Sequence, residues 1–329
     1  MSGTVAVIGS NSFSGSHFSA LLLEAGYRVT GISRSPEPDP LFLPPRLGDR
    51  KGFVFHRLDL NRDLDAVMAV LKRARPRHVV NFAAQGMVRE SWETPGDWFR
   101  TNTLSQVLLH DRLRRLDFLE KYLHVSTPEV YGPTAEKKTE DWNYRPSTPY
   151  AVSRAAADMS LASFFQAYSF PVVFTRAANV YGPGQRPYRL IPRVALAALT
   201  GGRMTLNNGG ASRRSFIQIE DAMRATMAVM EKGRPGEIYH IATERLTSIR
   251  EIAEMTAKTA GAELAELADN GPGRPGRDAV YNLDSSKIRR ELGWSDKVEL
   301  ADGIRETVAW VRDNLAALEA QPLEYRHKA

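Results

Sequence analysis

Short apolar runs alternate with amphipathic segments through the first half of the chain. Strand-like runs, rich in β-branched and aromatic residues, occur at Val5–Ile8, Val29–Ile32, Phe53–Phe55, Val79–Phe82, Tyr122–Val125 and Val172–Thr175. Apolar residues recur at helical spacing in the segments between and around them, at Ser14–Ala25, Asn61–Ala74, Asp97–Leu116 and Tyr150–Tyr168. Strands and helices that alternate in this way predict a parallel sheet with helices on both faces.

Local signals bound these elements. Gly26 stands where a helix C-cap glycine belongs, and Asn61 where an N-cap belongs. The segment Ser35–Gly52 holds five prolines and predicts an irregular surface loop. In the second half, the Gly- and Pro-rich segments Pro183–Pro192 and Gly271–Gly276 predict loops between shorter elements. Two late helices are predicted at Ser285–Leu292, capped by Asp284, and at Leu300–Leu318.

Length and composition fit a two-domain globular protein. The chain has 329 residues, and domains average about 150 residues. We expect an α/β fold with a doubly wound parallel sheet in residues 1–178, to which a later segment near 215–242 returns. Residues 179–329 are expected to form mainly a smaller α/β domain. The hydrophobic fraction of 43% is enough for a packed core.

Charge and cysteine content narrow the function. The net charge is +6, but Lys and Arg are scattered, which favours a solvated surface with one anion-binding cleft over a nucleic-acid partner. The absence of cysteine excludes disulfides and thiolate metal sites, and no metal is expected. The first apolar run has four residues, far short of the about 20 that span a membrane, and Met1–Gly3 lacks a basic signal-like start. We expect a cytoplasmic protein without a membrane partner.

A glycine-containing loop follows the first predicted strand directly. Gly9-Ser-Asn-Ser-Phe-Ser-Gly15 leads from that strand into a helix, with Ser12 midway between the glycines. Such a turn places backbone N–H groups and a helix N-terminus against a pyrophosphate. The loop therefore predicts a Rossmann-type dinucleotide site with contacts from Gly9, Asn11, Ser12, Phe13, Ser14 and Gly15.

The end of the second predicted strand bears on the identity of the cofactor. It reads Gly31-Ile-Ser-Arg-Ser35 and has no acidic residue to hold the ribose hydroxyls of NAD. Arg34, flanked by the hydroxyls of Ser33 and Ser35, is suited to the 2′-phosphate of NADP. We therefore expect NADP, with NAD as the alternative. The remaining cofactor candidates follow later strands and are Asp59, Leu60 and Ala83.

Tyr150 and Arg154 stand four residues apart at the start of a predicted helix. Residues at this spacing share a helix face, so the guanidinium lies beneath the same cleft as the phenol ring. A tyrosine is a poor base at neutral pH, but a nearby cation and a positively charged nicotinamide favour the phenolate. We interpret the pair as catalytic and cofactor-binding; the alternative is an ordinary helix face.

A polar loop follows the fifth predicted strand, at the carboxyl end of the sheet where ligands bind. It reads Ser126-Thr-Pro-Glu-Val-Tyr-Gly132. Ser126 or Thr127 can hydrogen-bond a sugar hydroxyl that loses its proton, and Glu129 offers a carboxylate that can remove a proton from carbon. The alternative roles are turn formation for the hydroxyls and a solvated loop position for the carboxylate.

Taken in order, these motifs resemble those of extended short-chain dehydrogenases/reductases that act on nucleotide sugars. The chain is most similar to the dTDP-glucose and GDP-mannose 4,6-dehydratases, and the resemblance covers nearly its whole length. The resembling segments are Gly9–Gly15, Asn81–Gln85, Ser126–Gly132, Pro146–Tyr150, Ala178–Pro183, Arg214–Gln218, Arg274–Gly276 and Glu291–Trp294.

The resemblance implies a role for each matched residue. Tyr150 deprotonates the sugar 4-hydroxyl while C4 gives hydride to the nicotinamide, Thr127 hydrogen-bonds the same oxygen, and Glu129 takes the C5 proton. Water then leaves from C6 and the hydride returns there, which yields a 4-keto-6-deoxy nucleotide sugar. The implied substrate contacts, with the last two clamping the diphosphate, are Gln85, Ser126, Asn179, Arg193, Arg214 and Arg274.

Two positions depart from the family pattern. Arg154 stands where the family has lysine; it keeps the positive charge but stays protonated and cannot relay a proton. Pro128 replaces the aspartate that serves the dTDP-glucose enzymes as general acid. The GDP-mannose enzymes also lack that aspartate, so Glu129 is expected to serve both elimination steps.

Other functions stay open at this point. Within the same fold they are a C4-epimerase, a 5,6-dehydratase and a uronate decarboxylase, although Glu129 argues against a simple C4-epimerase. From another class comes a non-catalytic nucleotide-sugar sensor, which Arg154 favours. The apolar excess of the helices at 98–116 and 150–168 and the family resemblance imply a homodimer joined by a four-helix bundle.

Overall fold

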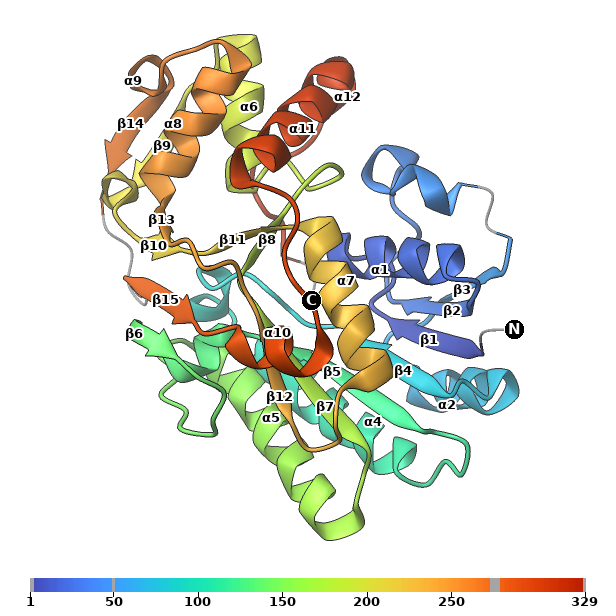
Figure 1. Ribbon diagram of the computed structural model, residues 1–329. Helices are drawn as coiled ribbons and strands as arrows, with labels where there is room; N and C mark the ends of the chain where they lie inside the picture. Colours follow the sequence, from blue (N-terminus) through green and yellow to red (C-terminus); the bar gives the residue numbers. More distant parts are fainter. Residues whose placement is uncertain (1–2, 49–50, 273–278, 328–329) are drawn as a thin grey trace.

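The structure is a computed structural model that describes residues 3–48, 51–272 and 279–327. At its centre lies a seven-stranded parallel sheet of order β12-β7-β5-β4-β1-β2-β3 (Figure 1). Its strands are β1 (Thr4–Ile8), β2 (Arg28–Ser33), β3 (Phe53–Arg57), β4 (His78–Asn81), β5 (Lys121–Ser126), β7 (Val172–Ala177) and β12 (Ile238–Ile241). Each of the six predicted strand-like runs lies in this sheet, so the doubly wound α/β prediction is confirmed. β12 comes from far along the chain and pairs with β7 at the sheet edge.

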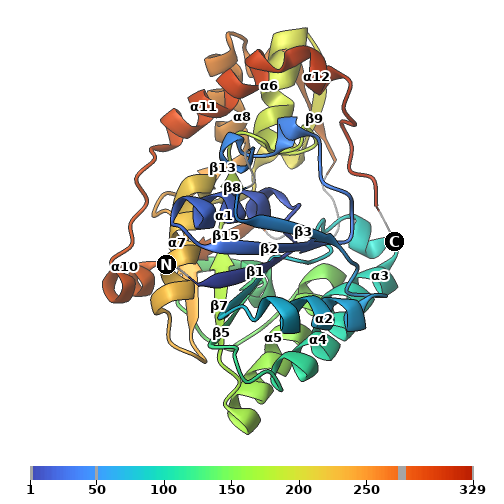
Figure 2. The same ribbon diagram turned by 90° about the vertical axis from the view of Figure 1, so that its right-hand side faces the viewer.

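Helices cover both faces of the sheet, as the alternation predicts. One face carries α1 (Phe13–Glu24), α7 (Ile219–Lys232) and α10 (Ser286–Leu292). The other carries α2 (Leu64–Ala74), α4 (Ser105–Leu113) and α5 (Pro149–Tyr168), which Figure 2 shows below the sheet. Because side chains alternate along a strand, Val5 and Val7 join the first core and Ala6 and Ile8 the second.

One predicted helix start was wrong. Gly26 ends α1 in a left-handed conformation, with φ of 82°, as its position indicates. α2, however, begins at Leu64 rather than after Asn61. The Asn61 amide instead holds the neighbouring segment, because its Nδ2 donates to Thr101 Oγ1 at 3.1 Å and its Oδ1 accepts from Ser105 Oγ at 2.6 Å.

The helix predicted over Asp97–Leu116 consists of three pieces: α3 (Pro95–Phe99), a π-helical turn (Arg100–Leu104) and α4. The wide turn directs Asn102 into the core. Its side chain accepts from the backbone N–H of Gln85 at 2.7 Å and donates to the Gln85 carbonyl at 2.9 Å and to Ser153 Oγ at 3.0 Å. The π-turn thus fixes the loop after β4, at the edge of the cleft described below.

Small sheets and a helical layer complete the fold; their elements come from the second half of the chain except for the first strand, and the helical layer is seen at the top of Figure 1. The strands pair as β13-β10-β15-β6, β11-β8 and β14-β9. They are β6 (Thr134–Lys138), β8 (Asn179–Tyr181), β9 (Met204–Asn207), β10 (Arg213–Arg214), β11 (Phe216–Gln218), β13 (Thr247–Ser248), β14 (Ala268–Gly271) and β15 (Val280–Leu283). The helices are α6 (Leu190–Thr200), α8 (Ile249–Ala260), α9 (Leu264–Leu267), α11 (Leu300–Asp313) and α12 (Leu315–Glu319).

Several predicted loops and helices differ in detail. The described part of Ser35–Gly52 contains the 3₁₀ turns Pro40–Phe42 and Pro45–Leu47, whose Phe42 and Leu47 are buried. α6 starts inside the predicted loop Pro183–Pro192, because proline is compatible with a first helical turn. The predicted last helix is divided at Asn314 into α11 and α12. Within the described residues, no helix combines the length and apolar content that a bilayer crossing requires.

Candidate active site

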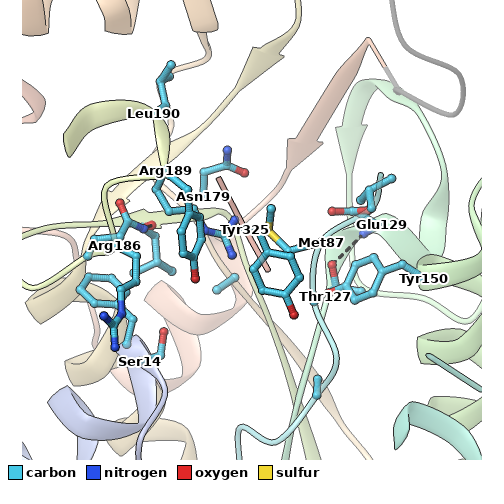
Figure 3. Close-up of a pocket in the computed structure, with 18 of the residues that line it drawn as sticks. Ser14, Met87, Thr127, Glu129, Tyr150, Asn179, Arg186, Arg189, Leu190 and Tyr325 are labelled. Atoms are coloured by element: carbon cyan, nitrogen blue, oxygen red, sulfur yellow. Dashed lines mark hydrogen bonds between the residues drawn. The ribbon is translucent and has the colours of Figure 1, made fainter. Parts of the chain in front are cut away.

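An open cleft of about 1530 Å³ lies at the carboxyl ends of the sheet strands, between the sheet and the second half of the chain (Figure 3). This is the position at which doubly wound sheets bind ligands. Most of the predicted site residues line it: Asn11, Ser12, Phe13, Ser14, Arg34, Gln85, Ser126, Thr127, Glu129, Tyr150, Arg154, Asn179 and Arg214.

The loop between β1 and α1 forms one wall of the cleft and needs both of its glycines. Gly9 has a φ of 84°, and a Cβ there would lie 2.7 Å from the backbone nitrogen of Ala83. A Cβ on Gly15 would collide with the carbonyl oxygen of Gly9. Ser12 is the N-cap of α1: its Oγ accepts from the Gly15 N–H at 3.0 Å and donates to the Gly9 carbonyl at 2.7 Å. The loop presents the α1 N-terminus to the cleft, which suits a pyrophosphate.

Asn11 and Ser33 brace this loop against the end of β2. The Asn11 N–H donates to Ser33 Oγ at 3.0 Å, and the Asn11 amide donates to the carbonyls of Ser35 at 2.9 Å and Pro36 at 3.0 Å. The predicted cofactor contacts at these two positions are therefore side chains already engaged in holding the loop.

Arg34 follows β2 and reaches across the cleft to the loop after β4. Its Nη2 donates to Gln85 Oε1 at 2.9 Å. Gln85, which the resemblance assigned to the substrate, is only 3% exposed and holds this guanidinium with its amide oxygen. The geometry thus groups Gln85 with Arg34, since the Gln85 amide joins the loop after β4 to the residue that follows β2.

Several predicted site residues do not line the cleft: Gly9, Gly15, Ser33, Asp59, Leu60, Ala83 and Arg193. The Asp59 carboxylate accepts from the Asn61 N–H at 2.9 Å and so stabilises the turn before α2, and Leu60 is buried in the sheet core. Arg193 was misplaced by the sequence pattern. It points away from the cleft on α6 and donates to the carbonyl of Leu323 at 3.4 Å. Arg274 lies outside the described residues.

Thr127, Glu129 and Tyr150 gather at one end of the cleft (Figure 3). Thr127 directly follows β5 and caps the 3₁₀ turn Pro128–Tyr131, and its Oγ1 accepts from the Glu129 N–H at 3.3 Å. Tyr150 stands in the first turn of α5, which Thr148 caps by accepting from the Ala151 N–H at 3.1 Å. The arrangement brings a hydroxyl, a carboxylate and a phenol to one place, as the motifs predict.

The groups around Tyr150 shift the pKa of its phenol in opposite directions. Burial raises the pKa of the Tyr150 phenol, and the Glu129 carboxylate adds to that rise. Arg154, the Thr127 side chain and Arg189 act in the opposite direction. In this structure the phenol is therefore protonated at neutral pH, and additional positive charge in the cleft would favour the phenolate.

Arg154 is buried beneath the phenol, with 2% of its surface exposed. Its Nη2 donates to the carbonyl of Val125, whereas its Nε is buried and has no hydrogen-bond partner among the described residues. A buried donor without a partner costs free energy unless a ligand satisfies it. Together with the glycine loop, this donor fits a dinucleotide whose hydroxyl groups would face Arg154.

A buried ionic cluster supports the catalytic end from below. The Asp158 carboxylate accepts from Ser126 Oγ at 2.7 Å, Arg176 Nη2 at 3.0 Å and the Tyr144 hydroxyl at 3.2 Å. Burial alone would raise the pKa of Asp158, but the adjacent His124 and Arg176 outweigh it and hold this pKa at about 2. The Ser126 hydroxyl, which the resemblance assigned to the substrate, thus donates a hydrogen bond to this carboxylate.

The opposite wall comes from the second half of the chain. Asn179 is exposed to the cleft at the start of β8. The Arg214 side chain packs over the Tyr281 ring at 4.3 Å and donates to the carbonyls of Arg213 at 2.7 Å and Ala279 at 3.1 Å. Sequence reasoning missed other residues that line the cleft: Met87, Arg186, Tyr188, Arg189 and Tyr325.

The sheet order, the glycine loop beside β1 and a tyrosine with a cation one helical turn further on define a short-chain dehydrogenase/reductase. Residues 7–307 match the family model described as GDP-mannose 4,6 dehydratase, and the chain belongs to this family. The family predicted from the motifs, and with it the prediction of an enzyme of the nucleotide-sugar dehydratase type, is confirmed.

Named relatives extend over most of the chain. A dTDP-glucose 4,6-dehydratase of Streptomyces niveus is 35% identical and covers 95% of this chain and 94% of its own. The human dTDP-D-glucose 4,6-dehydratase is 30% identical, with coverages of 94% and 90%.

Solved structures of two enzyme types are similar to the whole fold. A Streptomyces venezuelae dTDP-glucose 4,6-dehydratase with NAD bound has a TM-score of 0.87 and 30% identity over 96% of this chain and 99% of that one. A Thermus thermophilus UDP-glucose 4-epimerase complex with NAD has a TM-score of 0.85 and 30% identity, over 94% and 99%. Fold similarity alone therefore does not separate dehydration from epimerisation.

Proposed function

We propose that this protein is an NADP-dependent nucleotide-sugar 4,6-dehydratase that forms an NDP-4-keto-6-deoxyhexose and water from an NDP-hexose. The observation that carries the proposal is the group Thr127, Glu129 and Tyr150 at one end of the cleft (Figure 3). The dTDP-glucose 4,6-dehydratases among the relatives agree with it. Glu129 is the feature that favours dehydration, because inversion at C4 needs no base at C5.

Each of these side chains has a defined proton to handle. Tyr150 takes the proton of the 4-hydroxyl, and Thr127 hydrogen-bonds the same oxygen. Glu129 removes the C5 proton and delivers a proton to the C6 hydroxyl, which leaves as water; Pro128 offers no acid for this step. A nicotinamide bound in the cleft would supply the hydride acceptor for C4 and the donor for C6, and C5 would regain a proton from solvent through Glu129, so no net oxidation would result.

The diphosphate of the substrate is assigned to the wall opposite the glycine loop. Asn179 is open to the cleft there, and the guanidinium of Arg214 is held in place by two carbonyls and a tyrosine ring. A planar, pre-positioned guanidinium is well suited to phosphate oxygens. Arg189, which lines the same wall, replaces Arg193 in our assignment.

The choice of NADP rests on Arg34. β2 ends without an acidic residue, and the Arg34 guanidinium lines the cleft near the α1 N-terminus. An arginine at this position accommodates the 2′-phosphate. NAD is the alternative, since the structural neighbours named above hold NAD.

We also propose a homodimer. The helices on the outer face expose large apolar side chains, with Met159 61% and Leu104 56% exposed, and Leu108 and Phe99 beside them. A four-helix bundle made from α5 and the helical segment α3 to α4 of two subunits would cover these side chains. Light scattering at micromolar concentration tests this: a monodisperse monomer would contradict it.

The experiment that tests the reaction is a mass-spectrometric screen of the purified protein with NADP or NAD against dTDP-, UDP-, GDP- and CDP-hexoses. We expect loss of one water from one sugar, no net reduction of cofactor, and solvent deuterium at C5. Glu129→Gln is the matched variant and should lose the reaction. Isomerisation without a mass change would replace the proposal by an epimerase, and loss of carbon dioxide from a uronate by a decarboxylase. No turnover of any sugar would leave a binding protein.

A further inference from the structure

The carboxyl-terminal tail crosses the mouth of the cleft. After α12 it runs from the helical layer down toward α3 (Figure 2). On the side of the helical layer two arginines hold it: Arg186 Nη1 donates to Gln321 Oε1 and Arg193 Nη1 to the Leu323 carbonyl, each at 3.4 Å. The tail therefore joins the two regions that form the cleft.

Tyr325 is the residue of the tail that enters the cleft. Its ring packs edge-on against the Tyr188 ring, with the centroids 5.7 Å apart and the planes at 75°. Figure 3 shows it beside Met87, between Arg189 on one side and Thr127 with Tyr150 on the other. A ligand that extends from the glycine loop to Tyr150 would therefore pass next to this ring.

His327 fastens the tail to the sheet domain. Its ring stacks on Trp98 at 4.7 Å, its Nε2 lies 2.8 Å from Asp97 Oδ2, and its Nδ1 lies 2.8 Å from Gln85 Nε2. The Gln85 amide nitrogen can only donate, so Nδ1 accepts, and Nε2 carries the proton that bonds the carboxylate. Each ring nitrogen thus has a partner of the right kind.

The same contacts continue to Arg34. Gln85 donates from its amide nitrogen to His327 and accepts from Arg34 with its oxygen, so one buried side chain links the tail to the guanidinium. Because an amide presents its oxygen and nitrogen on opposite sides, His327 and Arg34 select the same Gln85 orientation. His327 is therefore a positioning residue for the end of the cleft where Arg34 lies.

We propose that residues 321–327 form a strap that retains the dinucleotide in the cleft, with Tyr325 as the side chain against it and His327 as the latch. This rests on the proposed function in one respect: a reaction that returns its hydride needs no exchange of cofactor between turnovers. A strap that slows exit of the dinucleotide then leaves turnover unimpaired, whereas in a net oxidation or reduction it would slow every cycle.

The test measures dissociation of NADPH, and in parallel NADH, from the full-length protein. The bound reduced dinucleotide is displaced by excess oxidised dinucleotide, and its fluorescence is followed in a stopped-flow instrument. We expect His327→Ala to raise the release rate about tenfold, since it removes a charge-assisted hydrogen bond and a ring stack. Tyr325→Ala should raise it by a smaller factor. Arg326→Ala is the matched control, because Arg326 is exposed in the same segment, and its release rate should stay at the wild-type value.

A second variant, and the melting temperature of each variant, show whether faster release merely reflects a less stable fold. Asp97→Asn keeps the shape of the latch while removing its charge, and should raise the release rate in the same direction. Release rates equal to wild type in His327→Ala and Asp97→Asn, or slower release in either, would overturn the strap. The assay contains no sugar, so it separates the two proposals. If the variants release the dinucleotide faster but the protein turns over no sugar, the dehydratase proposal fails and the strap proposal stands. If the protein turns over a sugar but the variants release the dinucleotide at the wild-type rate, the strap proposal fails and the dehydratase proposal stands.

Discussion

The two ends of the cleft are built in different ways. At one end, Tyr150 stands in the first turn of α5 and Thr127 directly follows β5, and the buried Asp158 carboxylate with its three hydrogen-bond donors lies on the same two elements and their neighbours. At the other end, Arg34 is held by Gln85, which in turn depends on His327 from the opposite end of the chain. The group around Tyr150 therefore rests on side chains that are buried within the sheet region, whereas Arg34 is held through contacts that reach the carboxyl-terminal tail.

The sharpest test of the catalytic end is Tyr150→Phe. The ring and its packing remain while the acidic hydroxyl is lost, so we expect kcat to fall by about a thousandfold. Steady-state kinetics on the sugar identified by the screen measure this. The melting temperature should be unchanged, and the release rate of NADPH should rise less than it does in His327→Ala. A kcat within tenfold of wild type would show that another group handles the 4-hydroxyl proton.

Asp158→Asn should lower the stability of the protein, because Asp158 is the carboxylate of the buried ionic cluster next to Ser126. The carboxylate is fully buried, and its loss leaves the Arg176 guanidinium uncompensated, so we expect unfolding to become easier by about 3–5 kcal/mol at pH 7. Urea unfolding measures this. Asp117→Asn is the matched control: its ion pair with Arg75 is 81% exposed on the Asp side and should contribute less than about 1 kcal/mol.

The acid dependence of Asp158→Asn has a defined sign. The pKa of Asp158 is held at about 2, below its ordinary value of 3.8. A group with a depressed folded-state pKa contributes stability above its unfolded-state pKa and loses it as the pH falls through the folded-state value. The deficit of the variant should therefore be constant above pH 4 and shrink between about pH 4 and 2. A deficit that persists at pH 2 would contradict the ionic origin.

Arg34→Ser should have the smallest effect of these substitutions and should change only the affinity for the dinucleotide. We expect the affinity for NADP to fall about tenfold, since one charged contact to the 2′-phosphate is lost, and the affinity for NAD to stay the same. Calorimetric titration of both dinucleotides measures the two values. Arg28→Ser, at the exposed start of the same strand, is the control. Equal losses for both dinucleotides would mean that Arg34 does not discriminate between them.

The regular part of the fold could be predicted because the pattern of apolar residues in its strands and helices is clear. Runs such as Val5–Ile8 and Val172–Thr175 are buried on both sides, so their apolar character shows without any partner. The π-turn at Arg100–Leu104 could not be predicted, because it depends on the hydrogen bonds between Asn102 and the backbone of Gln85, which no local sequence pattern reveals. Strands of two or three residues, such as β10 and β13, are defined by their partners and leave no periodic signal.

The candidate site divides along the same line. Tyr150, Thr127 and Glu129 lie in motifs of local spacing, and the structure brings them together. Arg193 and Arg189 stand one turn apart on the same charged segment, and only packing decides that Arg189 faces the cleft and Arg193 the tail. Tyr325 and His327 sit in a polar tail whose sequence carries no sign of its destination, so they appear only through contacts with residues far away in the sequence.

The edge strand β12 makes the sheet depend on the second half of the chain. The chain leaves the sheet after β7, builds part of the cleft wall opposite the glycine loop, and returns to add β12 beside β7. A gene fragment that stops after β7 would leave that strand as a bare edge, prone to pairing with other chains. The two regions therefore cannot be separated at the end of β7 without exposing that edge of the sheet.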